Sequence, residues 1–257
     1  MSSKMTAEEI RDGIARLGPF FHNVELPYGL RTWDPETAQR PLERVRVADL
    51  RSLVWPLVLE RFGGFENLRV LDVACNAGGF SVEAARSGAA EVVGIDIVDR
   101  YLEQARFLQS ALDLDQVSFR KMRIEELSPD REGTFDVVFC FDVLYHLENP
   151  ILALRSLTGV TRGLLVLETR VTDRPEWRDH PLWLMTRLPP FEEGTIAMAT
   201  GRWRTSEMCQ LVPAPRSVTT VLDFLGFDEI RQIEIEDPIY PHPDEVQALF
   251  TAVRSGP

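Results

Sequence analysis

Continuous apolar runs and helix-spaced apolar positions alternate along this chain, which predicts strands separated by helices. Apolar runs without polar alternation are typical of parallel strands that are covered on both faces of a sheet. The expected strands lie at 70–74, 91–96, 117–122, 135–141 and 163–169. The pattern therefore predicts an α/β fold with a doubly wound, Rossmann-like sheet, in which ligands bind beyond the carboxyl ends of the strands.

The residues before the first strand predict two helices with an aromatic segment between them. A capping box at 6–9 opens the first helix, which should stop at Gly18. A second helix is expected over 41–61. The aromatic segment 20–33 carries a Pro-Tyr-Gly turn between two short extended pieces. It could fold over the ligand or pack as a surface hairpin, and the sequence leaves both alternatives open.

The alternation breaks after the fifth apolar run. Segment 171–212 is rich in Trp and Met but irregular, which predicts an insertion that covers the active site with an adaptable apolar wall. A dimer interface or a satellite core would explain the same composition. A helix at 215–225 and strands at 227–235 and 248–253 complete the pattern. The expected domains are an N-terminal helical cap, 1–62, and a main domain, 63–257.

The first strand runs into a turn and then a helix, in the order RVLDVACNAGGFS over 69–81. Small residues in such a turn let a ligand approach the backbone, and the helix start offers unpaired N–H groups. The dinucleotide fingerprint is absent, since Cys75 and Asn76 stand where early glycines would be expected. Asp72 lies inside the strand end, where a carboxylate would repel a pyrophosphate. It suits instead a ligand with cationic groups, such as the amino group and sulfonium of S-adenosylmethionine.

A second acid, Asp96, ends the second strand. A carboxylate at that place can bind both hydroxyls of a ribose. A buried, hydrogen-bonded acid would explain Asp72 alone. The two acids and the turn together favour a cofactor site.

The composition is acidic, with 28 Lys and Arg against 40 Asp and Glu, a formal net charge of −12. Nucleic-acid affinity depends on Lys and Arg that neutralise phosphates, so the charge argues against a polyanion as the main partner. Neither the cysteines nor the histidines show metal-ligand spacing, and no metal site is expected. Cys75 and Cys140 should be small buried thiols. With no signal peptide and no membrane-spanning run visible, we expect a soluble cytoplasmic protein.

Four motifs in order, VLDVACNAGGFS, EVVGID, FDVVFCFDVLYHL and LLVLET, resemble those of class I S-adenosylmethionine-dependent methyltransferases. The resemblance covers 46–254 and implies a seven-stranded sheet with the strand order 3-2-1-4-5-7-6. More narrowly, FFHNVELPYGLRTW, DVLYHL and LVLETR are similar to the tRNA wobble-uridine carboxymethyl/methyltransferases and their small-molecule relatives. This chain is shorter and acidic, carries the insertion at 171–212, and lacks a counterpart lysine for a carboxylated cofactor. Ordinary S-adenosylmethionine is therefore expected.

The resemblance also implies which residues bind the cofactor. Asp72 and the turn would hold the methionine moiety, Asp96 would hold the ribose, and Ile97 would pack on the adenine. Ile124 and Glu125 would contact the adenine, and Phe141 would lie near the methyl donor. The expected cofactor-binding residues are Asp72, Ala74, Cys75, Asn76, Gly78, Asp96, Ile97, Ile124, Glu125 and Phe141.

Methyl transfer needs a base only if the acceptor carries a proton at working pH. His146 is a candidate base or acceptor-orienting group, or a helix-start histidine bonded to the backbone, and the adjacent Tyr145 is a further candidate catalytic residue. His22 could close over the acceptor, and Glu168 could orient the acceptor or a base or make a structural hydrogen bond. The expected substrate-contacting residues are Trp33, Trp183 and Trp203.

These observations favour O-methylation of a small, natural-product-type metabolite of secondary metabolism, by a protein that could form a homodimer. One alternative is a tRNA-modifying methyltransferase, for which an arginine cluster at 31–51 could supply a basic surface. The other is a non-catalytic cofactor-binding scaffold, favoured only by the altered turn. The acidic charge disfavours a nucleic-acid partner.

Overall fold

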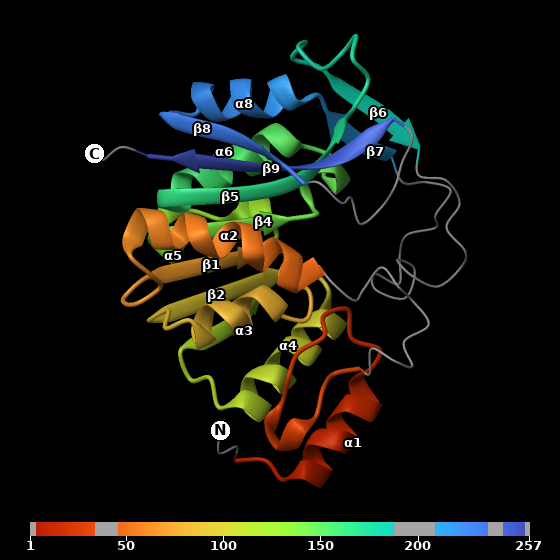
Figure 1. Cartoon of the computed structure of the whole chain (residues 1–257), viewed down its shortest axis with the longest axis vertical. Helices are drawn as coiled ribbons and strands as arrows, with labels where there is room; N and C mark the ends of the chain where they lie inside the picture. The colour runs from red at the N-terminus through yellow and green to blue at the C-terminus, as the bar shows by residue number, and fades with distance from the viewer. Residues whose placement is uncertain (1–3, 34–45, 188–208, 236–243, 255–257) are drawn as a thin grey trace. The chain divides into compact units, whose positions relative to one another are not determined.

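The computed structural model describes residues 4–33, 46–187, 209–235 and 244–254 (Figure 1). The chain divides into two compact units, Met1–Arg123 and Ile124–Pro257. Each unit carries part of the seven-stranded main sheet. Among the helices of the described residues, none has both the length and the apolar character to cross a membrane.

The first unit holds three parallel strands in the order β3-β2-β1. Strands β1 (Arg69–Val73), β2 (Glu91–Asp96) and β3 (Val117–Lys121) arise from the first three apolar runs. Helices α3 (Gly79–Arg86) and α4 (Asp99–Leu112) connect them. Each helix follows a strand end after a short turn, so the residues between strand and helix form the candidate ligand-binding edge.

Helix α1 (Ala7–Leu17) begins with the expected capping box. The Glu9 N–H donates to Thr6 Oγ1 at 3.3 Å, and the Thr6 N–H donates to Glu9 Oε2 at 2.7 Å. The helix ends at Gly18, as predicted. Helix α2 (Arg46–Phe62) confirms the second predicted helix, whose expected start at 41 lies outside the described residues.

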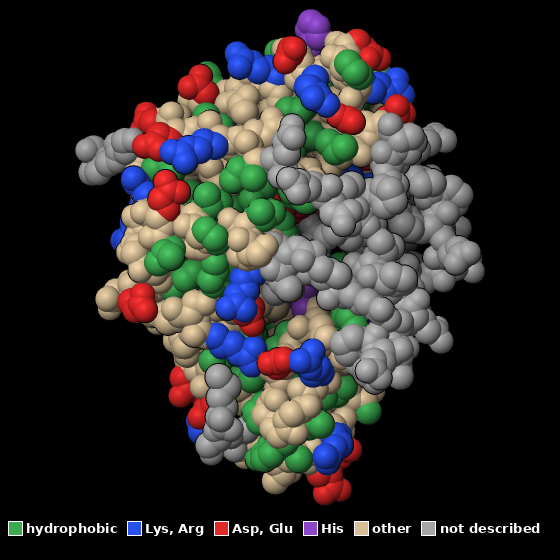
Figure 2. Space-filling model, viewed as in Figure 1, with side chains coloured by type: hydrophobic (Ala, Val, Ile, Leu, Met, Phe, Trp, Pro, Cys, Tyr) green, Lys and Arg blue, Asp and Glu red, His purple; other side chains and the backbone are tan. Residues whose placement is uncertain are grey.

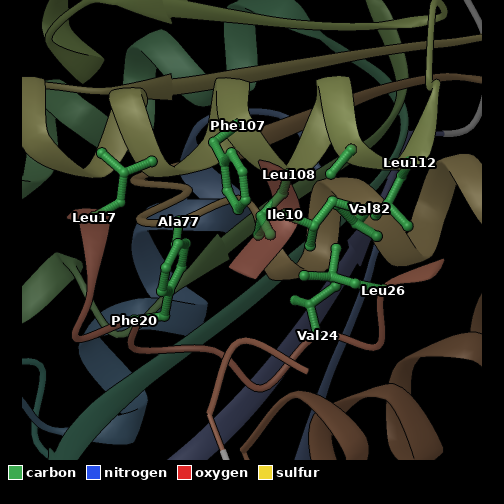
Figure 3. Packing of buried hydrophobic residues seen from close by; sticks show 11 residues of the cluster. Ile10, Leu17, Phe20, Val24, Leu26, Ala77, Val82, Phe107, Leu108 and Leu112 are labelled. Atoms are coloured by element: carbon green, nitrogen blue, oxygen red, sulfur yellow. The ribbon is translucent and has the colours of Figure 1, made fainter. Parts of the chain in front are cut away.

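The aromatic segment packs in the first unit as part of a hydrophobic cluster. It contains the 3-10 turn η1 (Pro27–Gly29) and an antiparallel bridge between Glu25 and Arg31, as the Pro-Tyr-Gly pattern predicts. Figure 3 shows its apolar side chains facing those of α4. The cluster consists of Ile10, Leu17, Phe20, Val24, Leu26, Ala77, Val82, Phe107, Leu108, Ala111 and Leu112. Burial of these side chains attaches the segment to the helices of the first unit.

The second unit holds four strands in the order β4-β5-β9-β8. Strands β4 (Phe135–Phe141) and β5 (Thr161–Thr172) are parallel, whereas β9 (Glu245–Val253) and β8 (Glu229–Glu234) pair antiparallel. The strand orders of the two units match the two halves of the order expected from the resemblance, 3-2-1-4-5-7-6. Strand β9 corresponds to strand 7 of that order, and β8 corresponds to strand 6. The predicted α/β class is confirmed.

The helices of the second unit are short, and the last of them ends one residue before the predicted bound at 225. Their bounds are η3 (Ile124–Glu126), α5 (Pro129–Glu132), η4 (Leu144–His146), α6 (Pro150–Val160) and α8 (Pro215–Phe224). The predicted insertion is more regular than its sequence indicates. Strands β6 (Trp183–Arg187) and β7 (Cys209–Pro213) form a two-stranded antiparallel sheet, and β5 extends to Thr172. The sequence did not predict this small sheet, because apolar periodicity does not show which two segments pair through their backbones.

Candidate functional site

The turn between β1 and α3 contains three residues in the left-handed region. Ala74 has φ 56°, Asn76 has φ 51° and Gly78 has φ 77°. Cys75, between Ala74 and Asn76, is not in this region, and its N–H donates to Ile95 O at 3.0 Å. Ala74 and Asn76 occupy the strained positions, where a non-glycine residue costs about 1–2 kcal/mol.

The side chain of Asn76 offsets part of this strain. Its Oδ1 accepts a hydrogen bond from the Ala77 N–H at 2.7 Å, which is the local bonding that lets asparagine enter the left-handed region. Tyr101, on the first turn of α4, hydrogen-bonds the same side chain, and burial raises the pKa of its phenol. Sequence reasoning missed Tyr101, because only the fold places this helix start beside the turn.

Asp96 connects the end of β2 to the turn. Its Oδ2 accepts from the Asn76 N–H and its Oδ1 from the Val98 N–H, both at 2.9 Å. Burial raises the pKa of this carboxyl above its usual value, and the backbone hydrogen bonds from Val98, Asn76 and Ile97 oppose the rise. The adjacent Ile97 side chain is 50% exposed. A carboxylate and an exposed apolar side chain at one strand end suit a ribose hydroxyl and a flat base.

Asp72 is less exposed than Asp96, and its carboxylate accepts a hydrogen bond from a side chain. Its Oδ2 accepts from Ser81 Oγ at 2.6 Å, which joins β1 to the first turn of α3. Burial raises the pKa of Asp72 to about 7, against the opposing effect of the Ser81 hydrogen bonds. This geometry agrees with the structural role that the sequence left open. A direct contact to the cofactor stays a prediction.

His22 lies against the start of α3. Its Nδ1 accepts from the Gly79 N–H at 3.0 Å, and the side chain is buried. In the neutral ring, the proton is then on Nε2, because one imidazole nitrogen accepts while the other carries the hydrogen. A catalytic role for His22 stays a prediction. The contact itself points to a role in holding the helix start.

In the second unit, Asp142 follows β4 with φ 55° and forms a polar cluster. Tyr145 Oη donates to Asp142 Oδ1, and the Arg170 guanidinium lies 5.0 Å from the centre of the Tyr145 ring. Arg170 also lies 3.7 Å from Glu245 Oε2. Glu168 is fully buried, and its main-chain carbonyl accepts from the Asp142 N–H at 3.1 Å.

His146 lies beside this cluster, with its ring 4.1 Å from that of Tyr145. Burial lowers its pKa to about 4, Asp142 opposes this effect, and Arg170 adds to it. Its main-chain N–H donates to Val143 O at 2.9 Å. Among the described residues, its Nδ1 is buried without a hydrogen-bond partner. The ring is therefore neutral near pH 7, and the hydrogen-bonding capacity of its buried Nδ1 is unused among the described residues.

The remaining candidates are spread over both units. Ile124 and Glu125 begin η3, and Phe141 ends β4 as a buried side chain. Trp33 is half-buried against the N-terminal cluster, and Trp183 begins β6. Trp203 lies outside the described residues. Sequence reasoning missed Ser81, Asp142, Arg170 and Glu245, although Arg170 follows the predicted Glu168 by two positions on one strand.

Residues 65–195, half of the chain, match the family model described as a methyltransferase domain. The chain belongs to the methyltransferase-domain family. The family uses S-adenosylmethionine as methyl donor. The first unit fits it, because the β2-end carboxylate of Asp96, the exposed Ile97 and the small-residue turn suit its ribose, base and amino-acid moiety.

Several curated relatives are ubiquinone biosynthesis O-methyltransferases. The Alkalilimnicola ehrlichii protein is 36% identical over 133 residues, 51% of each chain. The Bordetella avium protein is 33% identical over 134 residues, 51% of this chain and 52% of the relative. The chain spans about half the length of these relatives. Since they are not tRNA wobble-uridine enzymes, the narrower resemblance is not supported.

Solved structures share the fold of the family at low sequence identity. The N-terminal domain of EvdMO1, determined with SAH and D-fucose, has a TM-score of 0.69 at 19% identity and covers 99% of this chain and 100% of that chain. The magnesium protoporphyrin IX methyltransferase of Synechocystis, with bound SAM, has a TM-score of 0.58 at 20% identity, with coverages of 85% and 86%. At this identity the likeness concerns the fold alone.

Proposed function

We propose that this chain transfers a methyl group from S-adenosylmethionine to a hydroxyl oxygen of a small, natural-product-type metabolite. The observation that carries the proposal is the turn at 74–78 with Asp96 bonded to its backbone, in a chain of the methyltransferase-domain family. The curated relatives are ubiquinone biosynthesis O-methyltransferases, which favours oxygen as the accepting atom. When bound, the cofactor supplies an electrophilic methyl group on a sulfonium sulfur.

The first unit supplies the proposed cofactor-binding residues. Asp96 already accepts backbone hydrogen bonds from Asn76, Val98 and Ile97, and a carboxylate has about four acceptor sites, so it can also bind a ribose hydroxyl. Ile97 gives the base an apolar surface that is otherwise 50% exposed. Asn76 and Tyr101 hold the turn between them, which keeps the backbone in the shape that the ligand meets.

The second unit supplies the proposed group for the acceptor. A buried polar atom without a partner is rare, so the His146 Nδ1 fits an acceptor of a hydrogen bond from a substrate hydroxyl. With a pKa of about 4, the ring is too weak a base to ionise the hydroxyl in advance. It would orient the oxygen and take the proton as the carbon–oxygen bond forms. Tyr145, held by Asp142, fixes the ring from one side.

A small acceptor also agrees with the surface charge. Figure 2 shows basic side chains interspersed with acidic ones on the visible face of the described residues. With a net charge of −12, a polyanion would meet repulsion over much of the protein. A small metabolite does not depend on a continuous basic surface.

The test compares Asp96→Asn with Asp99→Asn by calorimetric titration with S-adenosylhomocysteine. Asp99 is exposed and paired with Lys121, so its substitution controls for the loss of one charge near the same strand end. We expect Asp96→Asn to weaken binding by about 10- to 150-fold, the loss of a hydrogen bond to a charged group. Asp99→Asn should bind like wild type. Equal affinities of the two variants would contradict the assigned cofactor site.

The acceptor is tested with a radiolabelled methyl group and a panel of hydroxyl-bearing small molecules. With a methylated substrate in hand, His146→Ala should lower turnover far more than cofactor affinity, because the ring contacts the acceptor and not the cofactor. Wild-type turnover of that variant would remove His146 from the reaction. Labelling of tRNA instead of small molecules would overturn the substrate class.

A further inference from the structure

The N-terminal segment 18–33 is held by side chains of the helices that follow the two cofactor-side strands. Gln104 Nε2, on α4, donates to Leu17 O at 2.8 Å and to Pro19 O at 2.9 Å. Arg86 Nη2, on α3, donates to Glu25 O at 2.6 Å. These donors bond main-chain carbonyls, so they fix the path of the segment regardless of its side chains.

His22 is the point at which this segment reaches the cofactor turn. Its ring packs edge-on against Phe80, with the ring centroids 5.8 Å apart at 79°. On its backbone side, Thr32 Oγ1 donates to His22 O at 2.7 Å and accepts from the Val24 N–H at 2.9 Å. The imidazole is therefore positioned from both ends.

The contact to Gly79 is close enough to require a glycine there. A Cβ at Gly79 would lie 2.5 Å from His22 Nδ1 and 2.6 Å from His22 Cγ. The third of the three nearest atoms is His22 Cβ, at 2.9 Å, so the atoms that a Cβ at this position would meet first all belong to His22. The Gly79 N–H begins α3 directly after Gly78, the last left-handed residue of the turn.

We propose that His22 is a positioning residue for the cofactor. By accepting the first N–H of α3 it fixes the helix start, and with it the shape of the strained turn at 74–78. The order of segment 18–33 and the affinity for the cofactor then depend on each other, since each stabilises the same backbone. This inference rests on the proposed function, because it assigns the turn to cofactor binding.

The first experiment separates the hydrogen bond from the packing. His22→Asn keeps an acceptor oxygen near the place of Nδ1, whereas His22→Leu keeps apolar volume without an acceptor. We expect S-adenosylhomocysteine to bind His22→Asn within about threefold of wild type and His22→Leu about fivefold or more weakly, the loss of one net hydrogen bond. Thr6→Ala, which loosens the α1 cap without touching the ring, controls for general loss of stability.

The second experiment measures the reciprocal effect. Hydrogen exchange of amides in 18–33 should slow when S-adenosylhomocysteine is added to wild type, and should respond less in His22→Leu. Gly79→Ala should also weaken binding, and the double variant with His22→Gly should recover part of the loss, because the clashing ring is then absent.

The outcomes distinguish the two proposals. If wild type binds the ligand but His22→Leu and His22→Asn bind alike, with unchanged exchange of the segment, the role of His22 is overturned and the cofactor site stands. If the folded wild type does not bind S-adenosylhomocysteine, the cofactor proposal fails, and the role of His22 fails with it.

Discussion

Replacement of Asp72 by Asn should stabilise the unliganded protein at alkaline pH. Asp72 is 2% exposed, and burial raises its pKa to about 7. The oxygen of an asparagine can still accept the hydrogen bond from Ser81 Oγ, which lies 2.6 Å from the carboxylate. The variant thus keeps the hydrogen bond and the volume but removes the cost of a buried charge.

The direction and size of the effect follow from the raised pKa. The pKa of Asp72 rises from its ordinary value of 3.8 to about 7 in the fold. At a pH between these two values, the folded protein therefore binds the proton more tightly than the unfolded chain does. The stability that this proton contributes is fully present below the ordinary pKa of 3.8 and is lost as the pH rises through the folded-state pKa of about 7. A difference of about 3 pKa units corresponds to up to ~4 kcal/mol. Asp72→Asn has no carboxyl to deprotonate, so its free energy of unfolding does not fall by this amount as the pH rises.

The assay is urea unfolding of wild type and Asp72→Asn at about pH 5 and about pH 8.5. The advantage of the variant should grow by roughly 2–3 kcal/mol between these conditions. Asp99→Asn removes an exposed carboxylate that is paired with Lys121 and serves as the matched control. A constant difference between wild type and Asp72→Asn would refute the argument that this carboxyl is protonated in the fold.

Two further changes test the turn and the neutral imidazole. Gly78→Ala forces a side chain at φ 77°, with its Cβ 2.7 Å from the Phe119 ring. It should cost about 2–4 kcal/mol in urea unfolding, and an unchanged midpoint would contradict the assigned strain. His146 has a pKa of about 4 in the fold, below its ordinary 6.5, so wild type should lose about 3 kcal/mol of stability as the pH falls from the higher value to the lower. His146→Gln should lack this loss in the same titration, and an identical profile would show that the ring is not buried as a neutral group.

Local signals in the sequence predicted most of the elements. The capping box set the start of α1, and the glycines after 62 and 225 mark helix ends within a residue or two. Apolar runs predicted the strands, because strands covered on both faces need continuous apolar side chains. The same reasoning did not find β6 and β7, whose pairing joins segments more than 20 residues apart.

The candidate site was only partly visible in the sequence. Asp96 could be predicted because it ends an apolar strand, and strand ends converge on ligands. The strained position at Ala74 could not, since a positive φ in a small residue leaves no compositional mark. Asp142 was likewise missed, because its role comes from the Tyr145 hydroxyl and a left-handed backbone that only the folded chain forms.

The sequence by itself determined the alternation of strands and helices, the acids at two strand ends and the family, because these depend on periodicity and on short motifs. The tertiary structure decided which groups are charged and which hydrogen bonds they make. Burial raises the pKa of Asp72 and lowers that of His146, and folding brings His22 to an amide 57 positions away. Desolvation and long-range contacts depend on what surrounds a side chain, and no local pattern in the chain encodes those surroundings.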